Sequence, residues 1–156
     1  MSRSRVTKSL AVAVMGLFAA HAATAQQTQS QGVPLESTAN FVYFSTGSHA
    51  LTPEEQDHIR DVAGMMQGTP TLVATIIGKA DAVGSADFNE RLSHQRAEAV
   101  FEVLVYTNKV AENRVQLCWT GERLPFVSTA DDVAESQNRM VAIIVSPAAF
   151  RHVCGG

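Results

Sequence analysis

Residues 72–97 have the sequence LVATIIGKADAVGSADFNERLSHQRA, and this stretch decides the fold. Leu72 to Ile77 is a nearly continuous apolar run, which is typical of a central, buried strand. Gly78 to Ser85 is rich in small and polar residues and predicts a loop. Ser85 is a good helix N-cap, and the pattern after it predicts a long helix to about Tyr106. The apolar stripe expected on that helix consists of Phe88, Leu92, Ala99, Val100, Val103 and Leu104.

A strand and a helix are predicted before this stretch. Phe41-Val42-Tyr43-Phe44 is a compact aromatic and β-branched run, which indicates a strand that ends at Ser45. Thr52, Pro53 and Glu55 then mark a helix start as cap, first-turn proline and capping-box glutamate. The buried face expected on this helix consists of Ile59, Val62, Ala63 and Met66.

Two strands and a short helix are predicted after it. The strands are Arg114 to Trp119 and Met140 to Val145, and Ala130 to Gln137 is the short helix between them. Strands separated by helices favour parallel pairing through right-handed crossovers. The predicted fold class is therefore α+β: a two-layer sandwich with the order β-α-β-α-β-(short α)-β. A mixed four-stranded sheet carries its helices on one face.

The N-terminal residues indicate export. Arg3, Arg5 and Lys8 precede the short apolar segment Leu10–Ala20, and Ala23-Thr24-Ala25 is a small-x-small cleavage site. Residues 1–25 are therefore predicted to be a signal peptide, and no transmembrane span is expected after its removal. The Gln-, Ser- and Thr-rich residues 26–37 are predicted to be a flexible linker. The folded domain is expected over 38–146, with a C-terminal tail over 147–156.

Composition limits the possible partners. The chain has 156 residues, 46% hydrophobic and 17% charged, with a formal net charge of -3, which fits one globular domain. The predicted cleavage removes three positive charges and leaves 9 Lys and Arg against 15 Asp and Glu. Because this balance is acidic and contains no long basic run, nucleic acid is not expected as a partner.

The two cysteines, Cys118 and Cys154, leave two possibilities open. An even number of cysteines in an exported chain suggests a disulfide, which would stabilise the fold by about 4 kcal/mol. The other possibility is one buried thiol and one thiol in the tail.

Asp81 and Arg96 are the candidate site residues on physical grounds. Asp81 follows the end of the predicted central strand, where ligands often bind. Arg96 interrupts the apolar line between Leu92 and Val100, and a buried charge is costly unless it is paired. The two side chains facing each other would form either a structural salt bridge or a receptor for a zwitterion, such as the amino-acid end of a peptide side chain.

The motifs that surround these residues resemble a known family. Gly78-Lys79-Ala80-Asp81-Ala82-Val83-Gly84 followed by Asn89-Glu90-Arg91-Leu92-Ser93-His94-Gln95-Arg96-Ala97 resembles the signature of OmpA-like C-terminal domains, G-H-T-D-x-x-G and N-x-x-L-S-x-x-R-A. Gly121-Glu122 and Gln137-Asn138-Arg139 extend the resemblance, which covers about Phe41 to Val145.

The resemblance implies a function and a set of site residues. It implies non-catalytic binding of peptidoglycan through the diaminopimelate of the stem peptide, with no cofactor. Asp81 would hold the ligand's ammonium and Arg96 its carboxylate, while Asn89 and Arg139 would line or adjoin the pocket. The expected location is the periplasm of a Gram-negative bacterium, and association with the outer membrane is left open. Other envelope proteins are further candidate partners.

The sequence also departs from the family pattern. Lys79 and Ala80 stand where the family has His and Thr, and Trp119-Thr120-Gly121 stands in place of G-Y-G. Lys79 either contacts anionic ligand groups or is a solvated lysine, and we expect the second. Trp119 either lies beside the glycan or closes the core, and its place in a strand favours the core. These departures motivate an alternative function, a protein-interaction module that has the fold without wall binding.

Overall fold

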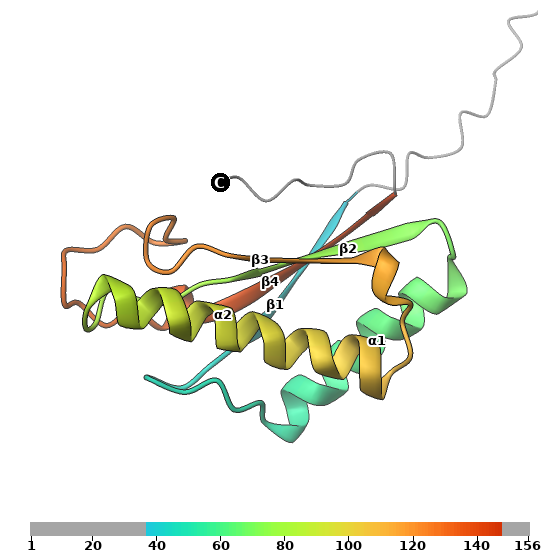
Figure 1. The fold of residues 1–156 in the computed structure, drawn as a ribbon, viewed down its shortest axis with the longest axis horizontal. Coiled ribbons are helices and arrows are strands. Elements are labelled where there is room, and N and C mark those ends of the chain that lie inside the picture. Colours follow the sequence, from blue (N-terminus) through green and yellow to red (C-terminus); the bar gives the residue numbers. More distant parts are fainter. Residues whose placement is uncertain (1–36, 148–156) are drawn as a thin grey trace, which may run out of the picture. The chain divides into compact units, whose positions relative to one another are not determined.

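The computed structural model describes residues 37–147. The predicted signal peptide, the linker up to residue 36 and the tail from residue 148 lie outside the described residues and stay predictions. The elements are β1 (Thr38–Tyr43), α1 (Pro53–Gly68), β2 (Leu72–Gly78), α2 (Ala86–Glu102), β3 (Val115–Trp119) and β4 (Met140–Pro147) (Figure 1). Three short helical segments also occur, at Val103–Thr107, Glu112–Arg114 and Ser136–Asn138.

The four strands form one mixed sheet in the order β1-β4-β2-β3. β2 and β3 pair in parallel, whereas β4 is antiparallel to both β1 and β2. The predicted parallel pairing is thus correct only for β2 and β3, the two strands that α2 connects. The chain leaves β3 at Trp119 and enters β4 at Met140 near the same end of the sheet, because Gly78 is paired with both Trp119 and Val141. A chain that turns back at one end of a sheet must continue antiparallel.

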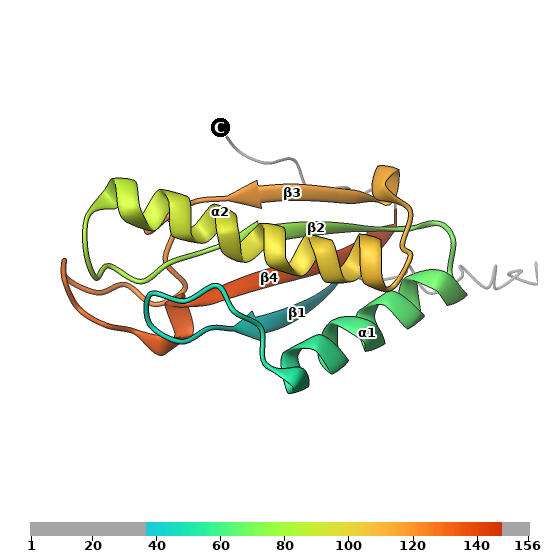
Figure 2. The same cartoon turned by 60° about the horizontal axis from the view of Figure 1, so that its bottom comes forward.

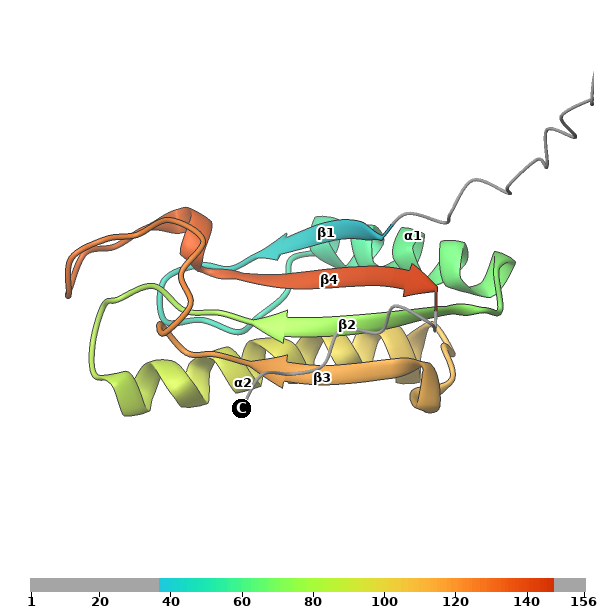
Figure 3. The same cartoon turned by 90° about the horizontal axis from the view of Figure 1, so that it is seen from above.

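Both long helices cover the same face of this sheet (Figures 2 and 3). The core between the layers is apolar. Along each strand, residues that face this core alternate with residues that face the other side, as the pleat requires. Its α1 contribution is the predicted set, since Ile59, Val62, Ala63 and Met66 are all buried. The predicted α+β two-layer architecture is therefore confirmed.

The helix starts follow the capping residues in the sequence. Thr52 caps α1 and accepts a hydrogen bond from the Glu55 N–H at 3.2 Å. The carboxylate of Glu55 accepts from the Tyr43 N–H at 3.2 Å, so it links α1 to the end of β1. Ser85 caps α2 through the Phe88 N–H. Phe88 itself is 42% exposed, so its predicted place in the core is wrong: α2 begins beyond the strand ends, where no sheet lies beneath it (Figure 3).

The predicted helix at Ala130–Gln137 is also wrong, because only the short turn Ser136–Asn138 is helical there. Asp132 has φ of 58°, in the left-handed region, which interrupts a right-handed helix. Its N–H donates to the Ala82 carbonyl, and its side chain accepts from the Gly84 N–H. These tertiary bonds tie the β3–β4 connection to the β2–α2 loop and replace the local helix.

A close contact between β2 and α2 positions the site. A Cβ atom on Gly78 would lie 2.0 Å from the Ser93 carbonyl oxygen, so only glycine allows this approach. Ser93 is buried and accepts a hydrogen bond from the Gly121 N–H at 2.9 Å. The contact holds the polar first half of α2 against the loop that follows β2. No helix within residues 37–147 is long and apolar enough to span a bilayer.

Candidate functional site

Arg96 is the largest fully buried side chain among the described residues, with 0% exposure. Its Nε donates to the Ser48 carbonyl at 2.9 Å, and its two terminal nitrogens donate to the carbonyls of Lys79 at 3.0 Å and Ser45 at 3.1 Å. The guanidinium also lies 5.3 Å from the centre of the Phe44 ring. Arg96 therefore joins α2 to the β1–α1 loop and to the residue after β2.

The charge on Arg96 is disfavoured by burial and favoured by a neighbour. Burial lowers the pKa of Arg96 to about 10, while the negative charge of Asp81 raises that pKa and the positive charge of Arg139 lowers it. A pKa of about 10 leaves the guanidinium charged at neutral pH. The buried end of the sheet thus contains a compact group of one negative and two positive charges.

The ion pair of Asp81 is formed with Arg139. Arg139 Nη1 donates to Asp81 Oδ2 at 3.1 Å, and Arg139 Nε donates to the Phe44 carbonyl at 3.2 Å. The Asp81 side chain is 3% exposed and the Arg139 side chain 16% exposed. Among residues 37–147, neither Asp81 Oδ1 nor Arg139 Nη2 has a hydrogen-bond partner. The pair therefore keeps one acceptor and one donor group for a ligand.

Sequence reasoning expected Asp81 to face Arg96. The structure brings the two charges close enough to interact, but the direct salt bridge of Asp81 is with Arg139, 58 residues away along the chain. Arg139 was expected only as an additional contact near the pocket. In the structure its guanidinium is the less buried cation of the group, and that of Arg96 is fully buried.

Two clefts lie near the Asp81–Arg139 pair, although Asp81 itself lines neither of them. One has a volume of about 430 Å³ and includes Arg139 among its lining residues, which are Tyr43, Phe44, Ser45, Ala50, Thr52, Ser136, Gln137 and Arg139. The other has a volume of about 220 Å³ and is lined by Ala80 and Ala82, the neighbours of Asp81, together with Asn138 and residues of the β3–β4 connection. The larger cleft has room for one amino-acid side chain beside the guanidinium of Arg139.

Asn89 is fully buried behind the second cleft. Its Nδ2 donates to Glu122 Oε2 at 2.6 Å, while its Oδ1 has no hydrogen-bond partner among residues 37–147. A buried amide oxygen without a partner is costly, which is common at sites that bind a ligand or a water molecule. Asn89 thus lies near the predicted pocket without lining the larger cleft.

Lys79 is half-buried and its ammonium donates to the Leu124 carbonyl. Burial lowers its pKa from the usual value. The expectation of a solvated lysine is therefore wrong, because Lys79 holds the β3–β4 connection against the end of β2. The next residue, Ala80, reinforces the attachment by donating its N–H to the Gly121 carbonyl at 2.9 Å.

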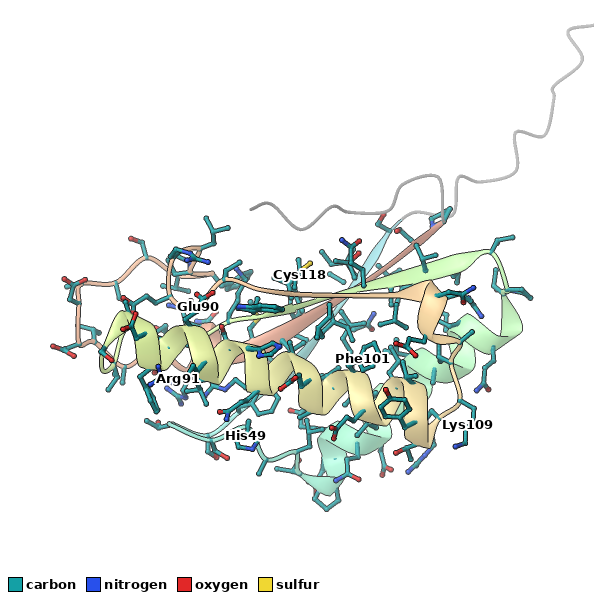
Figure 4. The ribbon with its side chains drawn as sticks, viewed as in Figure 1. His49, Glu90, Arg91, Phe101, Lys109 and Cys118 are labelled. Carbon is teal, nitrogen blue, oxygen red and sulfur yellow. The ribbon has the colours of Figure 1, made fainter. Side chains whose placement is uncertain are left out.

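Trp119 is 38% exposed, so the expectation of a core tryptophan is wrong. Its ring packs on His94 of α2 with ring centres 4.1 Å apart. The reason is topological: β3 is an edge strand, and its last residue lies at the periphery of the sheet. Figure 4 shows Glu90 and Arg91 on the same half of α2, where Glu90 forms an exposed ion pair with Arg123 at 3.3 Å.

Sequence reasoning missed the residues that contribute main-chain groups. Phe44, Ser45 and Ser48 supply carbonyls to Arg139 and Arg96, and no side-chain motif signals such a role. The sequence marks Asn138 only as part of the Gln137-Asn138-Arg139 motif. Its side chain both donates to and accepts from the backbone of Val127, which fixes the β3–β4 connection.

Metal and disulfide chemistry are outside this site. Within residues 37–147, no group of three or more His, Cys, Asp and Glu side chains is arranged to hold a metal ion. Cys118 is buried on β3, while Cys154 lies outside the described residues, so their pairing stays a prediction.

The OmpA family model matches residues 43–139, which contain all of these site residues. The chain belongs to the OmpA family. Within this family it is 33% identical over 108 residues to the probable lipoprotein YiaD of Escherichia coli, an alignment that covers 69% of this chain and 49% of YiaD. It is 30% identical over 109 residues to the peptidoglycan-binding protein ArfA of Mycobacterium tuberculosis, covering 70% of this chain and 33% of ArfA. The chain thus spans half or less of these two relatives.

The fold of this OmpA-family chain also agrees with solved structures. The peptidoglycan-associated lipoprotein of Burkholderia pseudomallei superposes with a TM-score of 0.62 at 24% identity, covering 68% of this chain and 89% of that protein. The C-terminal domain of Helicobacter pylori MotB gives a TM-score of 0.61 at 22% identity, covering 70% and 86%. At these identities the likeness concerns the fold alone.

Proposed function

We propose that this chain is a non-catalytic binding domain for peptidoglycan, which it recognises through the diaminopimelate of the stem peptide. The observation that carries the proposal is the Asp81–Arg139 pair: each partner has one polar atom unused within the described residues, and Arg139 lines an open cleft. Support also comes from membership in a family whose member ArfA is named for peptidoglycan binding.

The free end of diaminopimelate carries an ammonium and a carboxylate on one carbon, so its receptor needs both charges close together. Asp81 would accept from the ammonium, and a guanidinium would donate to the carboxylate. Arg139 offers the less buried guanidinium of the two. For Arg96 to contact the ligand directly, the loop carbonyls of Ser45 and Ser48 would have to give up their hydrogen bonds.

Arg96 thus has two roles in this proposal. It fixes the β1–α1 loop that forms one wall of the larger cleft, and it adds a second positive charge to that of Arg139 near Asp81. The carboxylate of the ligand then meets Arg139 first, with Arg96 as the deeper cation. This division refines the hypothesis that Arg96 alone holds the carboxylate.

The domain would act in the cell envelope of a Gram-negative bacterium. The predicted signal peptide would deliver it to the periplasm, where binding would tether or position it at the wall. Relatives named as lipoproteins and outer membrane proteins support this location.

The test is sedimentation of the mature chain with purified sacculi. We expect binding by the wild type, competition by free diaminopimelate and no competition by lysine, which lacks the second carboxylate. Asp81→Ala and Arg139→Ala should abolish binding. Asp57→Ala and Arg60→Ala are matched controls, because they remove an exposed ion pair on α1 and should bind like the wild type. Unchanged sedimentation of folded Asp81→Ala would refute the site.

A second candidate is an interaction module for another envelope protein. It is favoured by three exposed apolar side chains in the β3–β4 connection, Leu124, Phe126 and Val133. Crosslinking that captures a protein partner, combined with no sacculus binding by the wild type, would select this candidate.

A further inference from the structure

Three aromatic side chains gather on the helix-free face of the sheet, beside the larger cleft. Phe41 and Tyr43 alternate with the core residue Val42 on β1, so both point away from α1 and α2. Phe126, from the β3–β4 connection, packs on Phe41 with ring centres 5.9 Å apart. Tyr43 also lines the cleft that contains Arg139. These three side chains, here called the aromatic patch, are therefore continuous with the proposed ligand site.

The aromatic patch is open to solvent. Tyr43 is 45% exposed and Phe126 is 57% exposed, while Phe41 is half-buried. Single exposed apolar side chains are common on protein surfaces, whereas a group of them in contact usually marks a binding surface. The aromatic patch contains no charged side chain. An uncharged ligand with an apolar face is therefore the chemistry that it fits.

Hydrogen bonds next to the aromatic patch hold it in place. The Val127 N–H donates to Asn138 Oδ1 at 2.8 Å, and Asn138 Nδ2 donates to the Val127 carbonyl at 2.7 Å, which fixes the backbone beside Phe126. The N–H of Tyr43 donates to the carboxylate of Glu55 on α1 at 3.2 Å. A ligand that binds to such a pre-formed surface has little of the protein to order, so binding costs little entropy.

We propose that the aromatic patch binds the glycan of peptidoglycan, with the apolar face of an amino sugar stacked on the rings of Phe126 and Tyr43. The inference rests on the proposed function, because the cleft has to hold the diaminopimelate of the same ligand. An N-acetylated amino sugar is uncharged and combines a flat face of C–H groups with hydroxyl groups at its edge. The Tyr43 ring supplies apolar area, and its hydroxyl can donate to or accept from a sugar hydroxyl.

The length of the stem peptide fits this location. Two residues join the glycan to diaminopimelate, and two extended residues span about 7 Å. Phe41 and Tyr43 lie two positions apart on β1, which also corresponds to about 7 Å. The β3–β4 connection brings Phe126 to the β1 side of the sheet (Figure 3). A sugar attached to a stem peptide in the cleft can therefore reach all three rings.

Trp119 is less well placed for the same sugar. It lies at the end of β3, which is three strand spacings from β1, or about 14 Å. Its ring packs on His94 of α2 and so lies on the helix side of the sheet. A stem peptide in the cleft would have to cross the end of the sheet to bring its glycan there. The aromatic patch is thus the sugar contact that a short stem peptide allows.

The test compares two ligands, a disaccharide-peptide that contains diaminopimelate and the same peptide without its sugars. Calorimetric titration of the mature chain should show about tenfold tighter binding of the sugar-bearing ligand. Phe126→Ala should remove this difference and leave the affinity for the sugar-free peptide unchanged, because Phe126 does not line the cleft. Phe126→Tyr keeps the ring and should retain the difference.

Tyr106→Ala is the matched control. Tyr106 is 56% exposed, nearly as much as Phe126, and it lies beyond the C-terminal end of α2. This variant should bind both ligands like the wild type. Trp119 gives a second readout, because it is the single tryptophan of the chain. Its fluorescence should respond equally to the two ligands.

Three results would overturn the sugar site and leave the proposed function intact. One is equal affinity of the wild type for the two ligands. Another is a difference that persists in Phe126→Ala while Trp119 fluorescence changes only with the sugar-bearing ligand, since the glycan would then lie at the β3 edge. The third is an envelope protein whose binding Phe126→Ala abolishes, together with equal affinities for the two ligands. Binding of neither ligand by the wild type would overturn the proposed function and the sugar site together.

Discussion

The two ends of the central strand β2 are held by the same device and differ in charge. At its beginning, Arg114 donates to the carbonyls of Leu72, Met66 and Thr69. At its far end, Arg96 likewise donates to three main-chain carbonyls. Arginine suits both positions, because its planar fork satisfies several acceptors at once.

The difference between the two ends lies in what surrounds the guanidinium. Arg114 is only partly buried and closes the end of α1, whose last turn has no basic residue of its own. Arg96 is fully buried beside Asp81, Arg139 and an open cleft. The comparison shows that a buried cation becomes a candidate site when a carboxylate with a spare oxygen lies next to it. Otherwise it is a structural clamp.

The largest effect is expected from Arg96→Ala. This change leaves three carbonyls without their donor and removes one of the two positive charges near Asp81, so we expect a loss of about 4 kcal/mol in the free energy of unfolding. Urea denaturation measures it. Arg96→Lys keeps the charge and should recover part of the stability. A loss below about 1 kcal/mol would show that β2 tolerates removal of the arginine at this end at least as well as at the other end.

Arg114→Ala should cost about 2 kcal/mol, because Arg114 is only partly buried and water can take the place of its guanidinium. Sacculus binding by the folded variant should equal that of the wild type. Denaturation and sedimentation at a temperature well below the melting point separate the two quantities. Weaker sacculus binding by Arg114→Ala would contradict a purely structural role for Arg114.

Asp81→Asn should have the opposite profile. We expect about 1 kcal/mol of destabilisation, because Asp81 favours the charged form of Arg96 and its removal leaves two neighbouring cations. Binding to sacculi should fall about 100-fold, since the ligand ammonium loses its partner. Titration of labelled muropeptide measures this. Equal affinity of the asparagine variant would assign the ammonium to another acceptor.

The smallest effect is expected from Lys79→Met, which keeps the buried stem and removes the hydrogen bond to Leu124. We expect less than about 1 kcal/mol in stability. Affinity should change less than threefold, roughly the factor that about 0.6 kcal/mol represents. A tenfold loss of affinity, measured in the same titration, would place Lys79 among the ligand contacts.

Much of the fold could be predicted because its signals are local. Thr52 and Ser85 mark their helix starts through bonds to residues three positions ahead, and the α1 core face follows from helical periodicity. The failures have non-local causes. Phe88 is exposed because no sheet lies beneath the first turn of α2, and Ala130–Gln137 is not a helix because Asp132 bonds to the β2–α2 loop.

The site divides in the same way. The sequence by itself determined the element order, the caps and the two unusual charges, Asp81 and Arg96, because each stands out against its neighbours along the chain. Only the tertiary structure decided the partners: Asp81 pairs with Arg139, and Arg96 binds the carbonyls of Ser45 and Ser48. Every residue carries the same main-chain carbonyl, so no pattern can mark which ones a buried arginine will meet. That choice follows from the insertion of β4 between β1 and β2, which brings Arg139 and the β1–α1 loop to the end of the central strand.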